Sequence, residues 1–397
     1  MQTSPPSHPI KVMIAGLFSL VLTMGVARFS YTPLLPVMLD ETFLNDASGG
    51  WLASINYMGY MCGALIAASI SNLKLKDTLY RIGLLIAIVT TIGMALSENY
   101  VLWAVMRFFA GLSSAAGLLI GSGLILNWMI RHNHRLELGV HFGGAGLGIA
   151  LSAAVAMLMT NKFNWVEQWQ VFAVVGLLLA IPAWMWLPKP DSSGVTRSGE
   201  KLLDKPPKKS WMIVLFASYF CAGIGYVISA TFLVAIIDQQ VVLQGNGNLV
   251  WLVTGLAAAP ACIFWDRAAR KIGELKALFI AYGLNIIGII LPAFDSSLSG
   301  VLLSGFLFGA TFIGIVSLML TMVGKFYPTK PAKPMGKLTL SYGVAQILAP
   351  AISGTMAESS GNYNMPLIMA AIFMAVGMVL LVILQISEKY ESVEVKV

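Results

Sequence analysis

Apolar runs of about 20 residues recur along the whole chain, and they restrict its fold more than any other feature. The first begins near residue 12 and the last ends near residue 386. A helix of about 20 residues crosses the roughly 30 Å of hydrocarbon in a bilayer. Because open sheets cannot satisfy their backbone hydrogen bonds in lipid, such runs fold as helices. The sequence therefore predicts an all-α membrane protein that crosses the bilayer many times.

The composition excludes an ordinary soluble domain. Of the 397 residues, 57% are hydrophobic and only 11% are charged, whereas a soluble protein is about a quarter charged. The net charge of +7 does not indicate nucleic acid, because the basic residues lie in loops between the apolar runs. Cys62, Cys221 and Cys262 fall inside apolar runs, and we interpret them as small core residues. We expect a monomer in a lipid bilayer, with no nucleic acid, metal or cofactor bound.

The runs predict twelve transmembrane helices in two pseudo-symmetric six-helix halves. Their ranges are 12–37, 49–72, 79–97, 101–128, 138–160, 168–187, 211–237, 248–265, 275–294, 299–323, 337–357 and 366–386. Between the sixth and seventh spans lies a stretch rich in Pro, Ser, Gly and Lys, which is typical of a flexible linker. We therefore divide the chain into an N-terminal half (1–187), a linker (188–210) and a C-terminal half (211–397). Such duplicated folds bind solute between the halves near the middle of the membrane.

The loops also predict the orientation. Apart from Arg28, Arg107 and Lys162, every Lys and Arg lies on one side of the predicted spans, while the other side holds acids such as Asp40 and Glu358. Cytoplasmic loops carry an excess of basic residues. We expect both termini in the cytoplasm and the protein in the inner or plasma membrane.

Two arginines inside apolar spans are the main candidates for a site. A charged side chain at the centre of a membrane helix costs roughly 2.5–3.5 kcal/mol on insertion scales and usually faces the bundle interior. Arg28 and Arg107 fall at similar depth in spans one and four, and no Asp or Glu lies well inside any predicted span. Guanidinium groups match carboxylates and phosphates. We hypothesise that both arginines bind an organic anion. Its expected polar partners are Tyr31, Asn56, Tyr57, Tyr60, Tyr226 and Gln346.

An alternative is that each arginine donates to main-chain carbonyls, which Pro33 and Pro36 leave free, or extends to the membrane surface.

His141 in span five titrates near neutrality in its unperturbed form, so it is a candidate for proton coupling. A histidine hydrogen-bonded at a helix entrance is the alternative for that residue. The glycines of span five, such as Gly144 and Gly148, predict close helix contact rather than a nucleotide loop.

The whole chain resembles the major facilitator superfamily, and more narrowly its uncharacterised YbfB-like branch. Residues 25–36, 56–60, 223–232, 265–273 and 341–350 carry this resemblance. It implies the twelve-helix transporter fold and transport of a small solute by alternating access. Arg107 with Gly111 is similar to the superfamily's Arg-and-Gly motif in span four. Its signature of Asp, basic residues and Gly after span eight is matched by Asp266, Arg267, Arg270, Lys271 and Gly273.

The same resemblance assigns a gate to that last motif. Physically, the Asp266 carboxylate can face the positive N-terminus of span five, near residues 137–140, when the cytoplasmic side is closed. The alternative is a charged loop that only sets topology. The counterpart after span two, 71–77, departs from the pattern, so we expect the second half to hold the gate.

We therefore predict a secondary active transporter of a small organic anion. A multidrug or metabolite exporter is the nearest alternative, although such exporters more often carry acids inside the membrane. A membrane sensor that uses the fold without transport is an alternative of another class. No nucleophile–base pair, metal cluster or nucleotide loop indicates an enzyme.

Overall fold

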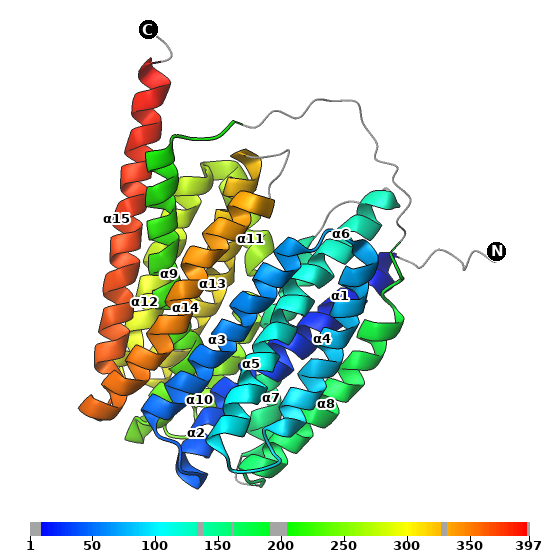
Figure 1. The fold of residues 1–397 in the computed structure, drawn as a ribbon. Coiled ribbons are helices and arrows are strands. Elements are labelled where there is room, and N and C mark those ends of the chain that lie inside the picture. The colour runs from blue at the N-terminus through cyan, green and yellow to red at the C-terminus, as the bar shows by residue number, and fades with distance from the viewer. Residues whose placement is uncertain (1–8, 133–137, 161, 191–204, 327–331, 395–397) are drawn as a thin grey trace, which may run out of the picture.

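A computed structural model describes residues 9–132, 138–160, 162–190, 205–326 and 332–394. All regular secondary structure in these ranges is helical. Figure 1 shows two bundles side by side, one built from the first part of the chain and the other from the last part. The long apolar runs account for this arrangement, because each buries its backbone hydrogen bonds within one helix.

The first bundle begins with one long span of three segments, which contains the predicted arginine. These are α1 (Pro9–Leu20), the π-helix η1 (Val21–Phe29) and α2 (Tyr31–Glu41). The other helices of this bundle are α3 (Asp46–Ser69), α4 (Leu73–Gly93), α5 (Tyr100–Ala115) continued by the π-helix η2 (Ala116–Ile120) and α6 (Gly121–Arg131), α7 (Leu138–Met159) and α8 (Trp165–Met185).

The second bundle has the same number of spans. Its helices are α9 (Lys209–Asp238), the short 3-10 turn η3 (Val241–Leu243), α10 (Gly247–Ala258), α11 (Ala261–Ile272), α12 (Glu274–Phe294), α13 (Leu298–Phe326), α14 (Ala332–Ser360) and α15 (Asn364–Glu394). Much of the predicted linker lies outside the described residues, so the boundaries 1–187, 188–210 and 211–397 stay a prediction.

Within the described residues, nine helices are long and apolar enough to cross a membrane, or ten when the bent pair α10–α11 counts as one span. When the long helices α4 and α14 are counted as well, the number of spans reaches the predicted twelve. Charged residues such as Lys74, Lys76 and Arg81 lower the hydropathy of α4. The all-α fold of two six-helix halves is therefore confirmed.

The eighth span differs from its prediction. It bends by 47° between α10 and α11, at Pro260, and continues to Ile272 rather than ending near residue 265. Proline cannot donate the helical hydrogen bond and bends the chain. The predicted gate residues Asp266, Arg267, Arg270 and Lys271 consequently lie on the last turns of a helix, not in a loop.

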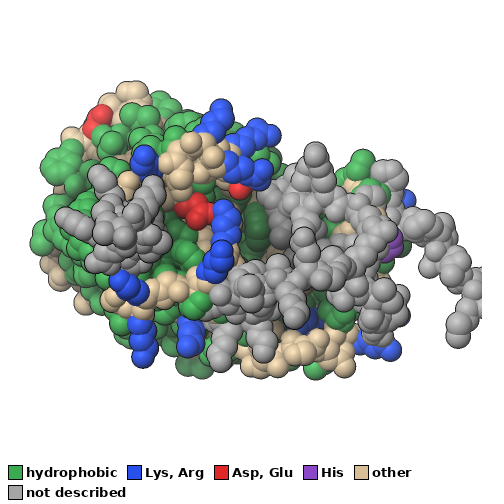
Figure 2. All heavy atoms as spheres, turned by 90° about the horizontal axis from the view of Figure 1, so that it is seen from above, with side chains coloured by type: hydrophobic (Ala, Val, Ile, Leu, Met, Phe, Trp, Pro, Cys, Tyr) green, Lys and Arg blue, Asp and Glu red, His purple; other side chains and the backbone are tan. Residues whose placement is uncertain are grey.

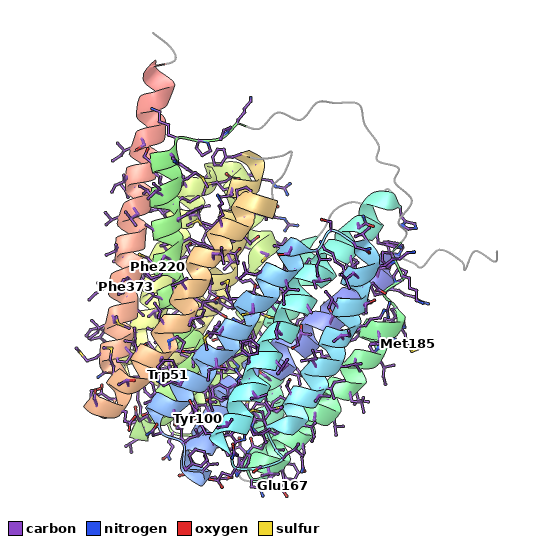
Figure 3. The ribbon with its side chains drawn as sticks, in the orientation of Figure 1. Trp51, Tyr100, Glu167, Met185, Phe220 and Phe373 are labelled. Carbon is purple, nitrogen blue, oxygen red and sulfur yellow. The ribbon has the colours of Figure 1, made fainter. Side chains whose placement is uncertain are left out.

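Charge separates the two ends of the molecule. We call the end where α1 begins and α15 ends the terminal face, and the other end the opposite face (Figure 1). Figure 2 looks onto the terminal face, where Lys and Arg side chains gather. Glu167, in the first turn of α8, lies at the opposite face, whereas Met185, at the other end of α8, lies on the outer side of the bundle (Figure 3).

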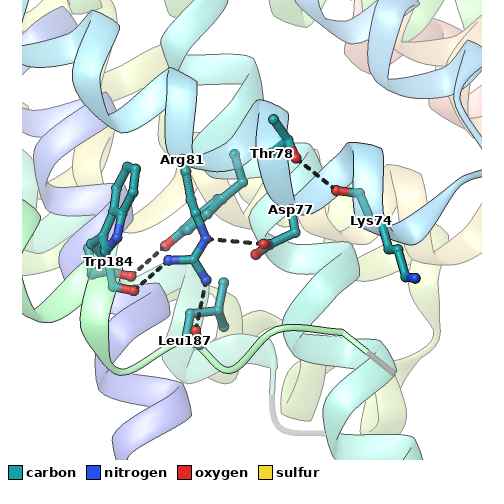
Figure 4. Close-up of polar contacts among 8 residues, drawn as sticks. Lys74, Asp77, Thr78, Arg81, Trp184 and Leu187 are labelled. Atoms are coloured by element: carbon teal, nitrogen blue, oxygen red, sulfur yellow. Dashed lines mark hydrogen bonds and ion pairs between the residues drawn. The ribbon is translucent and has the colours of Figure 1, made fainter. Parts of the chain in front are cut away.

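At the terminal face, Arg81 joins α4 to the end of α8 (Figure 4). Its guanidinium donates to the carbonyl oxygens of Trp184 (2.7 Å) and Leu187 (3.1 Å), and Asp77 accepts from its Nε at 3.1 Å. The last carbonyls of a helix have no intrahelical donor, so a basic side chain there satisfies them. This arginine therefore has a structural role within the first bundle.

Hydrogen bonds between the bundles lie toward the opposite face in the described part of the chain. Thr32 donates to the Ala230 carbonyl (2.6 Å), Asn45 to Glu358 (2.9 Å) and Tyr363 to Asp46 (2.5 Å). Further in, Trp251 donates to Ser152 and the Ala351 amide to Ser54. The two bundles diverge toward the terminal face (Figure 1). The structure is thus the conformation that is closed at the opposite face.

Small residues let the bundles touch backbone to backbone. A Cβ on Gly255 of α10 would lie 2.2 Å from the Ala150 nitrogen of α7, and one on Gly146 would lie 2.3 Å from the Ala259 nitrogen. Such approaches have no room for a methyl group. The glycines predicted to pack in span five do lie in close helix contacts: Gly146 faces the second bundle, whereas Gly144 and Gly148 face the first span.

Gly255→Ala should lower the free energy of unfolding by about 1–3 kcal/mol, because the new methyl overpacks the α7–α10 contact. The matched control is Gly283→Ala on α12, where the nearest atom to a new Cβ is 3.6 Å away. That control should be neutral or stabilising by up to about 1 kcal/mol, since alanine favours helix. Thermal unfolding of the detergent-purified variants measures both. Equal stability of the two variants would contradict the packing argument.

Candidate functional site

Seven polar or aromatic side chains meet where the two bundles face each other. We call them the seam cluster. Its members are Arg28, Asn56, Tyr57, Tyr60 and Arg107 from the first bundle, and Tyr226 and Tyr342 from the second. All are buried. Six of these seven were predicted from sequence, and helices far apart in the chain bring them together.

Arg28 lies in this cluster, and no carboxylate or main-chain oxygen of the described residues is bonded to it. Its side chain is 5% exposed, and the guanidinium carbon lies 4.3 Å from the Tyr57 ring centroid and 4.9 Å from that of Tyr60. Its Nη1 donates to the Met24 sulfur at 4.0 Å, its guanidinium also interacts with the Tyr57 side chain, and its Nε has no partner. No described Asp or Glu forms an ion pair with it. Cation–π contacts therefore stabilise this charge in place of a carboxylate.

Arg107 is held differently, by main chain as well as by an aromatic ring. Its Nη1 donates to the Ala27 carbonyl oxygen at 3.2 Å, and its guanidinium carbon lies 4.3 Å from the Tyr31 ring centroid. The Asn56 amide donates to the Arg107 carbonyl at 2.8 Å, which fixes α3 against α5. Arg107 thus adopts the main-chain-bonded alternative considered above, whereas Arg28 does not.

The π-helix explains how a main-chain oxygen becomes available to Arg107. In η1 the backbone bonds run one residue further back than in an α-helix, and the Ser30 amide donates to Gly25. Carbonyls displaced from the α-helical pattern accept side chains instead: Ser114 donates to Thr23 at 2.8 Å, and Arg107 donates to Ala27. π-Helical segments occur often at functional sites. Through these two hydrogen bonds the irregular backbone of η1 holds α5 beside Arg28.

The second bundle contributes an aromatic wall. The Tyr226 ring lies 5.1 Å from Phe312 and 5.8 Å from Tyr342, and Tyr342 lies 4.4 Å from Tyr219, all in stacked orientation. Across the seam, the Tyr57 side chain interacts with both Arg28 and Tyr226. A solute at this position would meet the Arg28 guanidinium, several phenol hydroxyls and flat apolar faces.

Both arginines line one small cavity. Its volume is about 10 Å³. Its lining residues are Arg28, Phe29, Tyr31, Thr32, Ala53, Asn56, Tyr57, Arg107, Ala230 and Thr231. Both bundles contribute to the lining, so the cavity lies at the seam.

Other predicted residues lie outside this cluster. Gln346 is buried on α14, one helical turn beyond Tyr342. His141 is fully buried within the first bundle, where its Nε2 lies 2.9 Å from the Ser122 hydroxyl and its ring contacts Gly16. It therefore lies away from the seam, and its role in proton coupling stays a prediction.

The predicted gate residues are exposed at the terminal face. Asp266 pairs with Arg270 on the same helix, and Arg267 and Lys271 are solvent-exposed. Glu137, at the expected contact of Asp266 on span five, lies outside the described residues, as do the side chains of 138–140. The gate contact thus stays a prediction.

Tyr342 and Thr32 were missed by the sequence analysis. Tyr342 stands beside a glycine in span eleven, and a polar aromatic residue among small residues within an apolar span was the available signal. Thr32 lies between Tyr31 and Pro33, within residues 25–36, and the sequence analysis considered its neighbours but not Thr32 itself.

A wide vestibule opens at the opposite face. Its volume is about 940 Å³, and both bundles line it. Asp40, Glu41, Asp238 and Glu358 contribute carboxylates, and Lys162 is the basic residue among its described lining. The vestibule therefore carries mainly negative side chains, whereas the terminal face carries mainly positive ones.

The fold is that of known transporters. The crystal structure of the nucleoside transporter NupG superposes with a TM-score of 0.72 over 96% of this chain and 99% of that chain, at 14% sequence identity. At that identity the likeness concerns the fold alone. Two helical bundles of this fold, with a polar cluster at their seam, define the class of protein as a helical membrane protein that crosses the bilayer many times.

Sequence comparison narrows the class to a family. The model of the uncharacterised MFS-type transporter YbfB matches residues 20–382, so the chain belongs to this family of the major facilitator superfamily. It is similar to the uncharacterised MFS-type transporter YceJ of Bacillus subtilis (strain 168), at 25% identity over 86% of this chain and 83% of that protein. Partial matches include the efflux pump radE of Floropilus chiversii (24% identity, 42% of this chain, 31% of that protein) and the niacin transporter NiaP of Acinetobacter baylyi (24%, 36% and 32%).

The two arginines should respond differently to replacement by methionine. Arg107→Met should lower the free energy of unfolding by about 3 kcal/mol, because it removes a charge-assisted bond to Ala27 and leaves a buried carbonyl unpaired. Arg28→Met should change it by less than about 1 kcal/mol, since the lost cation–π contacts are offset by removal of an uncompensated buried charge. Chemical or thermal unfolding in detergent measures this difference. A larger loss for Arg28→Met would show that Arg28 is the structural residue.

Proposed function

We propose that the protein is a secondary active transporter that carries a small organic anion, with Arg28 as the residue that recognises the anionic group. One observation carries this proposal: a buried guanidinium at the seam has neither a carboxylate nor a main-chain oxygen as partner among the described residues. An uncompensated buried charge costs several kcal/mol, and a solute carboxylate removes that cost through paired hydrogen bonds.

The geometry around Arg28 favours an anion with a single charged group. Because Arg107 is bonded to Ala27 and stacked on Tyr31, a carboxylate at the seam would pair with the Arg28 guanidinium, which has no carboxylate or main-chain partner among the described residues. The Tyr57 and Tyr226 side chains can donate to the same group from opposite bundles. The aromatic wall suits an apolar or flat remainder of the solute. Arg107, Asn56 and Tyr31 then position the site rather than contact the solute.

Alternating access follows from the location of this cluster. Tyr57 and Arg28 belong to one bundle and Tyr226 to the other, so a solute bound among them has a different affinity for each relative position of the bundles. The conformation closed at the opposite face exposes the terminal face, which on our reading of the loop charges is cytoplasmic. In this proposal the protein is a monomer in the plasma or inner membrane.

The charges at the two ends favour export of an anion. Basic side chains at the terminal face raise the local concentration of anions there, and carboxylates in the vestibule at the opposite face oppose their return. Partial matches to an efflux pump and to a niacin transporter are compatible with either direction.

A second candidate is an exporter of lipophilic solutes without regard to charge. The stacked rings of Tyr226, Phe312 and Tyr342 favour it, because flat apolar faces bind many hydrophobic molecules. The family to which the chain belongs is described as transporters, and this argues against a membrane sensor that does not move a solute.

A thermal-shift screen of purified protein should separate these candidates. Small monocarboxylates should raise the Tm of the wild-type protein and should have no effect on Arg28→Gln. The control Lys74→Gln removes an exposed charge at the terminal face and should retain the full shift. Uptake into proteoliposomes of the best ligand should fall at least tenfold in Arg28→Gln. Stabilisation by lipophilic cations alone, or by carboxylates in Arg28→Gln, would refute the anion proposal.

Asp266→Asn tests the gate. Among the described residues the Asp266 carboxylate pairs with exposed Arg270, so its loss should change the free energy of unfolding by less than about 0.5 kcal/mol. If it closes the terminal face in the other conformation, transport should fall several-fold. Glu274→Gln is the matched control, because Glu274 pairs with Lys325 on the same face within one bundle. Equal transport rates for both variants would remove the gate from the mechanism.

A further inference from the structure

We propose that a groove on the outer surface of the first bundle binds the headgroup of an anionic phospholipid. The groove lies at the terminal face, between the start of α4 and the end of α8, and its volume is about 690 Å³. Sites for small molecules typically measure roughly 300–1,000 Å³. Its lining includes Asp77, Arg81, Ile82, Trp184, Met185 and Lys189. None of these residues belongs to the seam cluster, so the site is independent of the solute.

The groove lies where charged and apolar surfaces of the bundle meet. Asp77 and Arg81 are in the first turns of α4, and Lys189 follows the end of α8. Trp184 is in the last turn of α8, and tryptophan is enriched at the membrane–water interface. Met185 points to the outer side of the bundle and is 72% exposed (Figure 3). This combination fits the boundary between lipid headgroups and acyl chains.

Arg81 has donors left for a phosphate. Its Nε, Nη1 and Nη2 each donate once, to the Asp77 carboxylate and to the carbonyls of Trp184 and Leu187 (Figure 4). A guanidinium has five N–H groups, so two of them, one on each terminal nitrogen, have no acceptor among the described residues. The Arg81 side chain is 14% exposed and lines the groove. The same arginine can therefore hold α8 and bind a phosphate oxygen.

The charge of the groove selects an anionic headgroup. Arg81 and Lys189 are its two cations, and Asp77 is the one carboxylate in its described lining, which leaves a net charge of +1. Asp77 is bonded to Arg81 and its side chain is 11% exposed, so its charge is directed mainly at that guanidinium. The ammonium of a zwitterionic headgroup would be repelled by the remaining positive charge. On the predicted orientation this face meets the cytoplasmic leaflet, which carries anionic lipids.

Two stripes of exposed apolar side chains continue from the groove along the bundle and offer a surface for acyl chains. The helices α4 and α8 pack against each other, and the Tyr80 hydroxyl donates to the Ala183 carbonyl. On each helix the stripe repeats at three- and four-residue spacing, so its members share one face. The members, which are 43–72% exposed, are Ile82, Leu85 and Val89 on α4, and Leu178, Ile181 and Met185 on α8. A free phosphate would lack these contacts.

Native mass spectrometry of the detergent-purified full chain, titrated with phosphatidylglycerol, tests the proposal. Lys189→Glu changes the net charge of the groove from +1 to −1 and should weaken binding of the first phosphatidylglycerol at least tenfold. The matched control Lys276→Glu makes the same change at an exposed position of the terminal face on α12 and should bind like the wild type. Phosphatidylglycerol should also raise the Tm of the wild type and of Lys276→Glu by about 2–5 °C, but not that of Lys189→Glu.

Arg81→Gln is a second variant with a different signature. It should lose phosphatidylglycerol binding, and it should also be less stable than the wild type without lipid, because two carbonyls at the end of α8 lose their donor. Lys189 has no such bond to the bundle among the described residues, so Lys189→Glu should keep the Tm of the wild type without lipid. The two variants together separate lipid binding from the structural role of Arg81.

Four results would overturn the proposal. They are equal binding of phosphatidylglycerol to Lys189→Glu and the wild type, an equal loss in Lys276→Glu, tighter binding of phosphatidylethanolamine than of phosphatidylglycerol, and an equal rise in Tm with inorganic phosphate. The second would indicate attraction to the whole terminal face, and the last a phosphate site without acyl contacts. None of these measurements involves Arg28, so the lipid site and the proposed function can fail separately.

Discussion

Two guanidinium groups lie deep in an apolar bundle and share one small cavity, and no carboxylate among the described residues neutralises them. The energetics of the whole seam follow from this constraint. Charges of like sign at low dielectric repel each other, and each also lacks the water that would solvate it. Aromatic rings lie with their centroids 4.3–4.9 Å from the guanidinium carbons, and one main-chain oxygen, supplied by an irregular helix, accepts from Arg107. These contacts are weaker than an ion pair. On the proposed function, an anion bound at Arg28 would stabilise the site.

The first span makes this arrangement possible because its backbone is not a regular α-helix. The π-helix η1 turns Arg28 toward Tyr57 and supplies the Ala27 carbonyl to Arg107. Gly25 lies so close to Gly148 of α7 that a Cβ would be 2.5 Å from its Cα. A bulkier residue there would push the first span away from its neighbour. Close glycine packing and the irregular helix thus fix the position of one guanidinium group.

Most of the fold could be predicted from the sequence, because each membrane span carries its own signal in about 20 apolar residues. The bounds of α7, for example, differ from the predicted 138–160 by a single residue. The bend at Pro260 was missed, since hydropathy alone does not separate one bent span from a short span followed by a loop. The selection of Arg28, Arg107 and Tyr226 rested on depth along each helix, which the helical rise gives directly. Their different partners depend on rotation about the helix axes and on a π-helix, and neither has a reliable sequence signal.

The two halves contribute unequal chemistry to the seam, and this inequality can couple binding to movement. Arg28 belongs to the first half and Tyr226 to the second, and across the seam Tyr57 interacts with both. When the bundles close around Arg28, water is excluded and the cost of its charge rises. A form closed on both sides is then favoured only when an anion is bound at Arg28. On the proposed function, this dependence would suppress the return of an empty carrier, because the solute supplies the charge that the second bundle lacks.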